Sequence, residues 1–467
     1  MSDDDRTRDR KVTFSEIFRI GEYRAVFFAT QLSFVGDFIS KAAVTALVFV
    51  ETQSALLAAA AFAISYAPWA IGGPFLATLA ERCRYRRIMV ICDITRAGLV
   101  ALVALPGNPV WLMLVLLFTV SLLAPPAQAA RSAIMPLILS GDRVTLGIAV
   151  NQTGSQATQA IGYMSGALLS IINPRLALLI NAATYVVSAI VIRSGVRDRA
   201  PAIRPEQRSN LWRETQEGFG VVFGTPTLRM IAIVVFASML FSIVPEGLAI
   251  GWAEELSGDS EARRGFYQGL IMIANPVGSV TAALLITRLM RPAIRQRFVP
   301  FLGIAAPLAL VPAVFDPGIA VVVAMTMISG FAITGMLPVL NGTFVQILRH
   351  GYRARAFGVM NSGMQLLQGG AVLAVGALIS ATNAHLPIVV GLWSAAGVVL
   401  MVILFSRWPK PHVFASAIAE ATTANQVAVA DSAEAASTGN VGATATTPPV
   451  PPQARSPRAE QGAYPKP

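Results

Sequence analysis

The feature that most constrains this chain is a succession of apolar stretches, each long enough to cross a lipid bilayer as a helix. About 20 apolar residues span the hydrocarbon core. The stretches, some with polar interruptions, are 24–50, 55–80, 88–105, 110–138, 147–171, 176–193, 230–251, 266–287, 298–315, 318–347, 356–380 and 385–406. Only a helix or a closed barrel satisfies its own backbone in lipid. The sequence therefore predicts an all-α polytopic membrane protein with twelve transmembrane helices.

The composition excludes other classes of protein. The chain is 54% hydrophobic and 13% charged, whereas soluble domains carry about 25% charged residues. Its two cysteines, Cys83 and Cys92, are too few for a disulfide scaffold. The sequence contains no zinc-protease, phosphate-loop or dinucleotide motif. We therefore expect no cofactor, no metal site and no enzymatic activity, and an ion gradient rather than ATP as the source of energy.

A long polar stretch divides the chain into two halves of six predicted spans each. The predicted segments are an N-terminal arm (1–22), a first bundle (23–193), a linker (194–229), a second bundle (230–408) and a tail (409–467). The tail is rich in Ala, Thr, Ser and Pro and is predicted to be disordered.

The later part of the linker, 210–223, mixes aromatic and charged residues. Trp212, Phe219 and Phe223 alternate with Arg213 and Glu217. Such a pattern is typical of an amphipathic helix on the membrane surface. A solvated linker helix is the alternative interpretation.

The distribution of basic residues predicts the orientation in the membrane. Most of the 36 lysine and arginine residues fall in the termini, the linker and alternate loops, whereas the opposite loops hold only Arg175, Arg263 and Arg264. Cytoplasmic segments carry this excess in membrane proteins. We therefore expect a multi-pass protein of the bacterial inner membrane with both termini in the cytoplasm. The net charge of +11 then faces cytosol and anionic lipid, so no nucleic-acid partner is expected.

The two halves show a weak internal repeat. Ser33-Phe-Val-Gly-Asp37 corresponds to Ser242-Ile-Val-Pro-Glu246, and Gln156-x-x-Gln159 corresponds to Gln365-x-x-Gln368. Parallel repeats of this kind place a binding site at the bilayer midplane between two bundles. The repeat therefore predicts two pseudo-symmetric six-helix bundles around a central cavity.

Several motifs resemble the major facilitator superfamily, and within it the bacterial exporters of the macrolide-efflux and enterobactin-exporter type. The similar features are Ser33-x-x-Gly36-Asp37, the loop from Gly73 to Arg87, Asp93-x-x-Arg96, Pro125-Pro126-Ala127-Gln128, Pro136, Asn151, Asn181, and Arg353-x-Arg355 before Asn361. The resemblance covers most of residues 20–406.

The resemblance implies export of an amphipathic small molecule, such as a drug, secondary metabolite or siderophore, coupled to proton entry. The expected partners are therefore the small-molecule substrate, the proton and the bilayer, and we expect a monomer. A lipid or lysolipid flippase on the same fold is one alternative. A non-transporting membrane sensor or assembly partner is another.

Three charged residues inside the predicted spans are candidates for ion coupling. Asp37 lies near mid-depth of the first span, and Lys41 follows four residues later on the same helix face. Glu246 lies at the equivalent place in the second half. Charges in the membrane interior are costly and usually paired or functional. We expect Asp37 to titrate, with Lys41 modulating it; a permanent Asp37–Lys41 ion pair is the structural alternative.

A second set of charges is predicted to form a cytoplasmic gate. These residues cluster at the inner ends of the second, third and fourth spans: Glu81, Arg82, Arg86, Arg87, Asp93, Arg96 and Arg131. A network of this kind can hold one state of the transporter and break in the other. Anchoring by positive charge is the alternative interpretation.

The predicted substrate cavity combines amides with adaptable apolar side chains. The candidates are Gln156, Gln159, Tyr163, Phe236, Met239, Asn275, Asn341, Gln365 and Gln368. Hydrogen bonding between helices is the default role of each amide. The Gly162-x-x-x-Gly166 pattern in the fifth stretch predicts close helix packing rather than a site.

Overall fold

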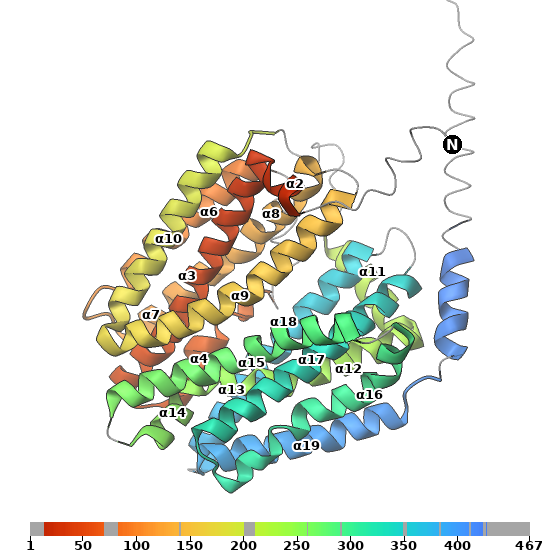
Figure 1. The fold of residues 1–467 in the computed structure, drawn as a ribbon. Coiled ribbons are helices and arrows are strands. Elements are labelled where there is room, and N and C mark those ends of the chain that lie inside the picture. Colours follow the sequence, from red (N-terminus) through yellow and green to blue (C-terminus); the bar gives the residue numbers. More distant parts are fainter. Residues whose placement is uncertain are drawn as a thin grey trace, which may run out of the picture.

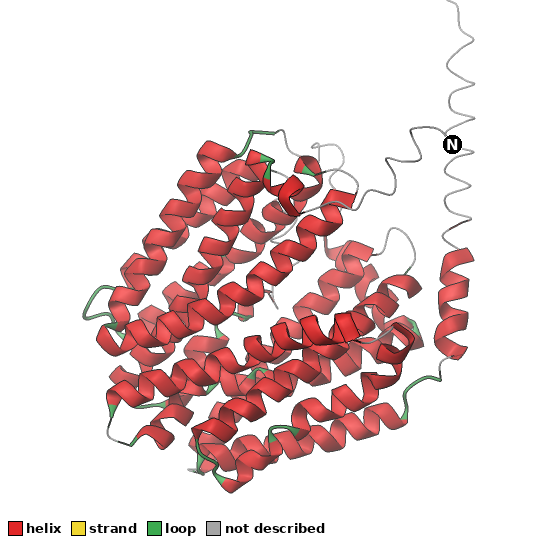
Figure 2. Cartoon of the chain, viewed as in Figure 1, coloured by secondary structure: helices red, strands yellow, loops and turns green. Residues whose placement is uncertain are grey.

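A computed structural model describes residues 14–69, 83–139, 142–199, 211–258, 260–289, 292–348, 353–382, 384–410, 412–423 and 426. All regular structure in these ranges is helical, as Figure 2 shows. The helices form two bundles, one from each half of the chain (Figure 1). The all-α prediction is therefore confirmed.

The first bundle is drawn in red to yellow in Figure 1. Its helices are α2 (Phe14–Phe18), α3 (Gly21–Thr52), α4 (Ala55–Ala63), α6 (Tyr85–Val103), α7 (Val110–Leu122), α8 (Ala124–Ile138), α9 (Asp142–Ile172) and α10 (Pro174–Gly195). Helix α3 is central, because it packs against α4, α9 and α10.

The second bundle is drawn in green to blue. Its helices are α11 (Leu211–Gly224), α12 (Pro226–Ser242), α13 (Val244–Gly247), α14 (Ala249–Ser257), α15 (Glu261–Leu289), α16 (Pro292–Leu308), the 3-10 turn η2 (Val311–Phe315), α17 (Ile319–Ile347), α18 (Arg353–Thr382) and α19 (Leu386–Ser406). The continuous helix α3 of the first half therefore has the broken series α12, α13 and α14 as its counterpart.

Within the described residues, 9 helices are long and apolar enough to cross a membrane. Each predicted stretch lies on a helix where it is described, but three stretches do not reach this standard. Helix α4 ends at Ala63 after 9 residues, α6 carries Arg86, Arg87, Asp93 and Arg96, and α9 is rich in amides and small polar residues. The count of twelve spans therefore stays a prediction.

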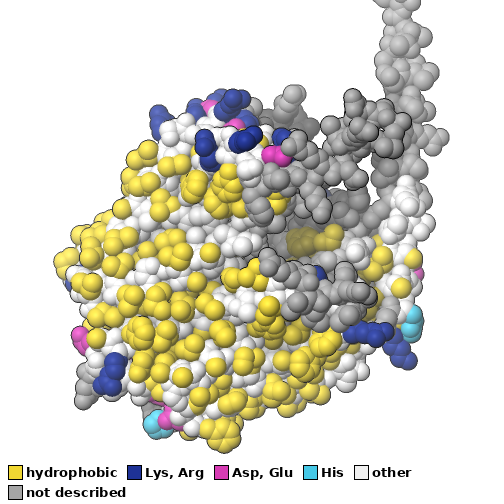
Figure 3. Space-filling view, viewed as in Figure 1, with side chains coloured by type: hydrophobic (Ala, Val, Ile, Leu, Met, Phe, Trp, Pro, Cys, Tyr) yellow, Lys and Arg dark blue, Asp and Glu magenta, His cyan; other side chains and the backbone are white. Residues whose placement is uncertain are grey.

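The exterior is apolar, as a surface in contact with lipid requires. Ile172 is 77% exposed, Trp111 66% and Phe301 65%. Figure 3 shows apolar side chains over the flanks of both bundles, with basic side chains at the ends. Exposed apolar area on this scale marks an interaction surface, as expected for a protein whose helices span a bilayer.

Glycines of α9 allow it to lie directly on α3. A Cβ atom added to Gly166 would lie 2.6 Å from the Ile39 carbonyl oxygen and 2.8 Å from Ile39 Cα. A Cβ at Gly162 would lie 2.8 Å from the Val35 carbonyl oxygen. These neighbours are backbone atoms, which cannot rotate away. The packing role predicted for this glycine pair fits these contacts.

Replacing Gly166 by alanine is therefore expected to lower the free energy of unfolding by about 1–3 kcal/mol, because α3 and α9 must separate. Thermal unfolding in detergent measures the change. Gly98 on α6 is the matched control, since nothing lies within 4 Å of a Cβ added there. Gly98→Ala should leave stability unchanged or raise it slightly through helix propensity. Equal melting temperatures for both variants would contradict the expectation.

The two bundles contact each other mainly through two helix pairs, α9 with α15 and α4 with α18, with smaller contacts of α3 and α4 to α13, α14 and α15. Gln268 on α15 also donates to the Ala42 carbonyl oxygen and to Thr45 Oγ1 on α3, both at 3.0 Å. Gly265 lies against the side chain of Ile171. These contacts lie toward the end of the molecule where α9 ends and α15 begins.

The linker helix and part of the tail belong to the second bundle. Helix α11 packs on α18 and α12, and Arg355 forms an ion pair with Glu217. The prediction of a disordered tail is wrong for residues 412–423, which are helical. Phe414, Ala417 and Ile418 pack against the core of the bundle. Their spacing repeats at helical intervals, a signal that the polar composition of the whole tail conceals.

Candidate transport site

A cavity of about 200 Å³ lies in the first bundle, next to α18 of the second bundle. Its walls come from α3, α4 and the residues that follow, α6, α7, α8 and α10, with one residue from α18. The lining is Phe34, Asp37, Phe38, Ser40, Lys41, Val44, Ala61, Ile64, Ser65, Tyr66, Trp69, Arg96, Leu117, Val120, Ser121, Ala124, Gln128, Arg131, Tyr185 and Gln365. We call this space the charged cavity.

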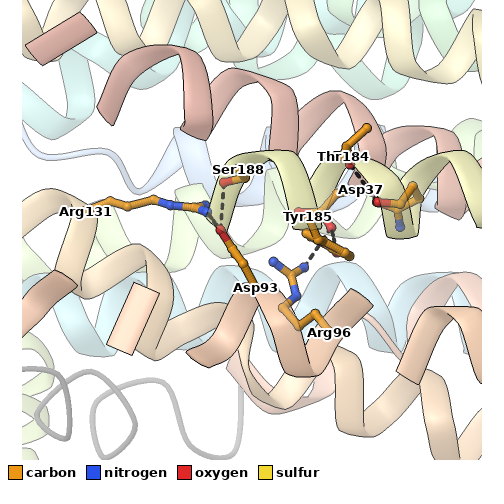
Figure 4. Close-up of polar contacts among 8 residues, drawn as sticks. Asp37, Asp93, Arg96, Arg131, Thr184, Tyr185 and Ser188 are labelled. Atoms are coloured by element: carbon orange, nitrogen blue, oxygen red, sulfur yellow. Dashed lines mark hydrogen bonds and ion pairs between the residues drawn. The ribbon is translucent and has the colours of Figure 1, made fainter. Parts of the chain in front are cut away.

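Asp37 forms an ion pair across helices. Arg96 Nη2 on α6 lies 2.7 Å from Asp37 Oδ1, and the Tyr185 hydroxyl on α10 donates to the same oxygen (Figure 4). The Arg96 guanidinium also lies 4.3 Å from the centre of the Tyr185 ring. Arg96 is almost fully buried, whereas Asp37 is 23% exposed and faces the cavity. Asp37 is thus both paired and accessible.

A second ion pair lies one turn along α6. Arg131 Nη2 on α8 lies 3.1 Å from both carboxylate oxygens of Asp93, and the Ser188 hydroxyl donates to Asp93 Oδ2 at 2.7 Å (Figure 4). Asp93 is fully buried and Arg131 is 4% exposed. This pair joins α6, α8 and α10.

Lys41 turns toward aromatic rings. Its Nζ lies 4.5 Å from the ring centre of Tyr66, 5.5 Å from that of Phe62 and 5.6 Å from that of Phe38. It also lies 3.5 Å from the Tyr66 hydroxyl. Rings attract an ammonium through their negative faces. Among the described residues, no carboxylate lies within ion-pair distance of Lys41.

Glu246 lies in the second bundle, close to this site. It is 3% exposed and sits on α13, where the helix path breaks. Its Oε2 atom has no hydrogen-bond partner among the described residues. It interacts electrostatically with Lys41 and with Tyr66.

The sequence profile of the Major Facilitator Superfamily matches residues 26–369. The chain belongs to the major facilitator superfamily.

Two curated relatives match more weakly. The uncharacterized MFS-type transporter YvqJ of Bacillus subtilis (strain 168) is 24% identical over 248 residues, which are 50% of this chain and 58% of YvqJ. Macrolide efflux protein A of Streptococcus pyogenes is 24% identical over 185 residues, 37% of this chain and 44% of that protein. The alignments thus span about half the length of these relatives.

Solved structures of other transporters share the fold. The nucleoside transporter NupG has a TM-score of 0.62 at 15% identity, and the match covers 83% of this chain and 99% of NupG. A POT family transporter in complex with 5-aminolevulinic acid has a TM-score of 0.67 at 10% identity, covering 82% and 95%. The fold is therefore that of the major facilitator superfamily.

Of the predicted ion-coupling residues, the structure brings Asp37 and Lys41 to one cavity and Glu246 into electrostatic range of Lys41. The alternative of a permanent Asp37–Lys41 ion pair is wrong, because Arg96 occupies Asp37 and Lys41 turns to its aromatic neighbours. Residues four apart share a helix face, but Asp37 forms its ion pair with Arg96 of the neighbouring helix α6 instead of with Lys41 of its own helix.

The predicted cytoplasmic gate divides into three parts. Glu81 and Arg82 lie outside the described residues. Arg96 and Arg131 line the charged cavity and are each paired with an acid, and their role in a gate stays a prediction. Arg86 lies 3.5 Å from Asp198 at the end of α10, and Arg87 lines a surface groove with Arg193. A hydrogen bond from Arg84 holds the pKa of Asp198 below its ordinary value.

The predicted substrate-cavity residues stay a prediction, and the structure places them at several sites. Gln365 lies on the wall of the charged cavity. The other candidates lie elsewhere. Gln368 donates to Met239 Sδ at 3.0 Å, and Asn275 donates to the Ser242 carbonyl oxygen at 3.2 Å. Phe236 packs on Gly363, and Tyr163 is fully buried beside Phe38, whereas the remaining amides are half-buried: Gln156, Gln159 and Asn341. Gln368 and Asn275 thus have the default role of an amide between membrane helices, a hydrogen bond to a neighbouring helix.

Sequence reasoning missed Tyr185 and Ser188, which donate hydrogen bonds to Asp37 and Asp93. The signal was present on α10, where Asn181, Tyr185 and Ser188 recur at intervals of four and three residues in an apolar helix. Such spacing places all three on one face. A polar stripe of this kind in a membrane helix points to buried partners.

Proposed function

We propose that this protein is a secondary-active exporter that moves an amphipathic small molecule across the bacterial cytoplasmic membrane by alternating access, coupled to proton entry. The observation that carries the proposal is the charged cavity, which holds Asp37 and Lys41 beside Glu246 of the other bundle. Ionisable groups inside a membrane protein usually serve substrate or proton movement. The likeness to macrolide efflux protein A supports the outward direction.

The contacts between the bundles fit alternating access. With both termini in the cytoplasm, the end where α9 meets α15 faces outward. The Gln268 hydrogen bonds and the Gly265 contact then close the outer side. This arrangement corresponds to a cytoplasm-facing state, which rocking of one bundle would convert to the opposite state.

Glu246→Gln tests the coupling. Flux of three fluorescent amphiphiles (anilinonaphthalene sulfonate, phenylnaphthylamine and ethidium) into or out of proteoliposomes is measured with and without an imposed pH gradient. We expect the variant to lose stimulation by the gradient, because an amide cannot exchange a proton, while the protein remains folded.

Glu420→Gln is the matched control, since Glu420 is exposed on the tail helix. It should transport at the wild-type rate. Wild-type stimulation in folded Glu246→Gln protein would refute the role of Glu246. The absence of gradient-driven flux of all three probes in the wild type would count against proton-coupled export of amphiphiles.

A further inference from the structure

The charged side chains of the cavity differ in how many hydrogen bonds and ion pairs they form with other residues. Asp37 accepts hydrogen bonds from Arg96 and Tyr185, and Arg131 binds both oxygens of Asp93. These two ion pairs are balanced in charge. Lys41 has a single hydrogen-bond partner among the described residues, the Tyr66 hydroxyl. An ammonium has three donors, and among the described residues Lys41 is the cation of the cavity wall that has no carboxylate within ion-pair distance.

Among the described residues, Lys41 offers the free donors of the lining. Arg96 and Arg131 also line the cavity, but each is paired with an acid, and their Nε atoms are buried. A carboxylate or sulfonate group only accepts hydrogen bonds. Lys41 therefore makes the polar wall better suited to an anionic group than to a cationic one.

The rest of the lining is apolar. Phe34, Val44, Leu117 and Val120 contribute to the wall, with Trp69 near the end of the described part of the second span. A pocket with convergent polar groups on one side and apolar side chains on the other binds amphipathic molecules. A cationic amphiphile would meet Lys41 with like charge, and its natural partner Asp37 is already bound to Arg96.

We propose that the substrate is an amphipathic organic anion whose acidic group binds Lys41 Nζ while its apolar part lies against Phe34, Leu117 and Val120. This inference rests on the proposed transport function, for which it names the class of substrate. Glu246 interacts electrostatically with Lys41. When ionised, it competes with the substrate anion for the ammonium, and when protonated it leaves Lys41 free.

Binding is tested with three ligands of the same size and shape: naphthoate, naphthylmethanol and naphthylmethylammonium. The full-length protein in detergent is titrated with each, and the melting temperature gives the affinity through ligand stabilisation. We expect naphthoate to bind most tightly and the ammonium least tightly. A tighter affinity for the ammonium than for the carboxylate would overturn the proposal on wild-type protein alone.

Variants then assign the binding to Lys41. Lys41→Met should weaken naphthoate binding by about tenfold or more, because a charged partner is removed, whereas Lys41→Arg should retain most of the affinity. Lys410→Met is the matched control, since Lys410 is exposed beyond α19, and should bind as the wild type does. Glu246→Gln should tighten naphthoate binding. Unchanged affinity in folded Lys41→Met protein would refute the assignment, and so would weaker binding in Glu246→Gln.

The binding measurement does not depend on transport, so the two proposals fail separately. Naphthoate binding that requires Lys41, without gradient-driven flux in proteoliposomes, would leave the anion site standing and refute the transport function. Gradient-driven flux of ethidium, with no preference for naphthoate in the binding series, would refute the anion site and leave the transport function standing.

Discussion

Asp37→Asn is expected to reduce pH-gradient-driven flux in proteoliposomes by about tenfold or more, equivalent to about 1.4 kcal/mol of transition-state stabilisation. The carboxylate accepts from both Arg96 and Tyr185. A neutral amide keeps the shape but leaves the Arg96 charge without its counterion. Because Asp37 is partly exposed to the cavity, water can solvate Arg96 in part, so we expect the variant to fold.

Two variants make this result specific. Asp316→Asn is a control of the same chemistry, because Asp316 is exposed and its left-handed backbone (φ 49°) also suits asparagine. Tyr185→Phe removes one hydrogen bond but keeps the ion pair, so its effect should be smaller than that of Asp37→Asn. A wild-type rate in folded Asp37→Asn protein would refute a role for this carboxylate in transport.

Arg131→Met is expected to lower the free energy of unfolding by about 3–5 kcal/mol, since removing one partner of a buried ion pair leaves the other charge uncompensated. Asp93 is fully buried and would keep only the Ser188 hydrogen bond. Thermal unfolding in detergent measures the loss. Adding Asp93→Asn to Arg131→Met should restore part of the stability, because the remaining charge is then neutralised.

Arg143→Met is the matched control for this prediction. Arg143 is 45% exposed and lies 3.8 Å from Glu16. Ion pairs at the surface contribute about 0–1 kcal/mol, so this variant should melt close to the wild type. Similar losses for Arg131→Met and Arg143→Met would show that the buried pair has no special importance for stability.

The sequence predicted most of the fold because the apolar stretches determine where helices cross the membrane. The helix predicted in the linker is present as α11, but its packing on α18 was not predictable, since amphipathicity alone does not identify the surface that the apolar face covers. The helix over 412–423 was missed because the prediction rested on the average composition of the whole tail. The helical spacing of Phe414, Ala417 and Ile418 is too short a pattern to change that average.

The charged residues of the candidate site could be identified from the sequence, but the partners with which they pair could not. Charge inside apolar spans singled out Asp37, Lys41, Asp93, Arg96 and Glu246 from the sequence. Their partners were not predictable, because sequence spacing reports neighbours on one helix only. The Asp37–Arg96 pair depends on how α3 and α6 are rotated about their axes, which packing of the whole bundle decides.

The break between α12 and α14 has a consequence for how the two bundles communicate. Gly247, next to Glu246, lies directly against the side chain of Val372 on α18. The same helix α18 carries Gln365 on the wall of the charged cavity. A shift of α18 on ligand contact would therefore displace the short segment that holds Glu246, so that occupancy of the first bundle is transmitted mechanically to a carboxylate of the second.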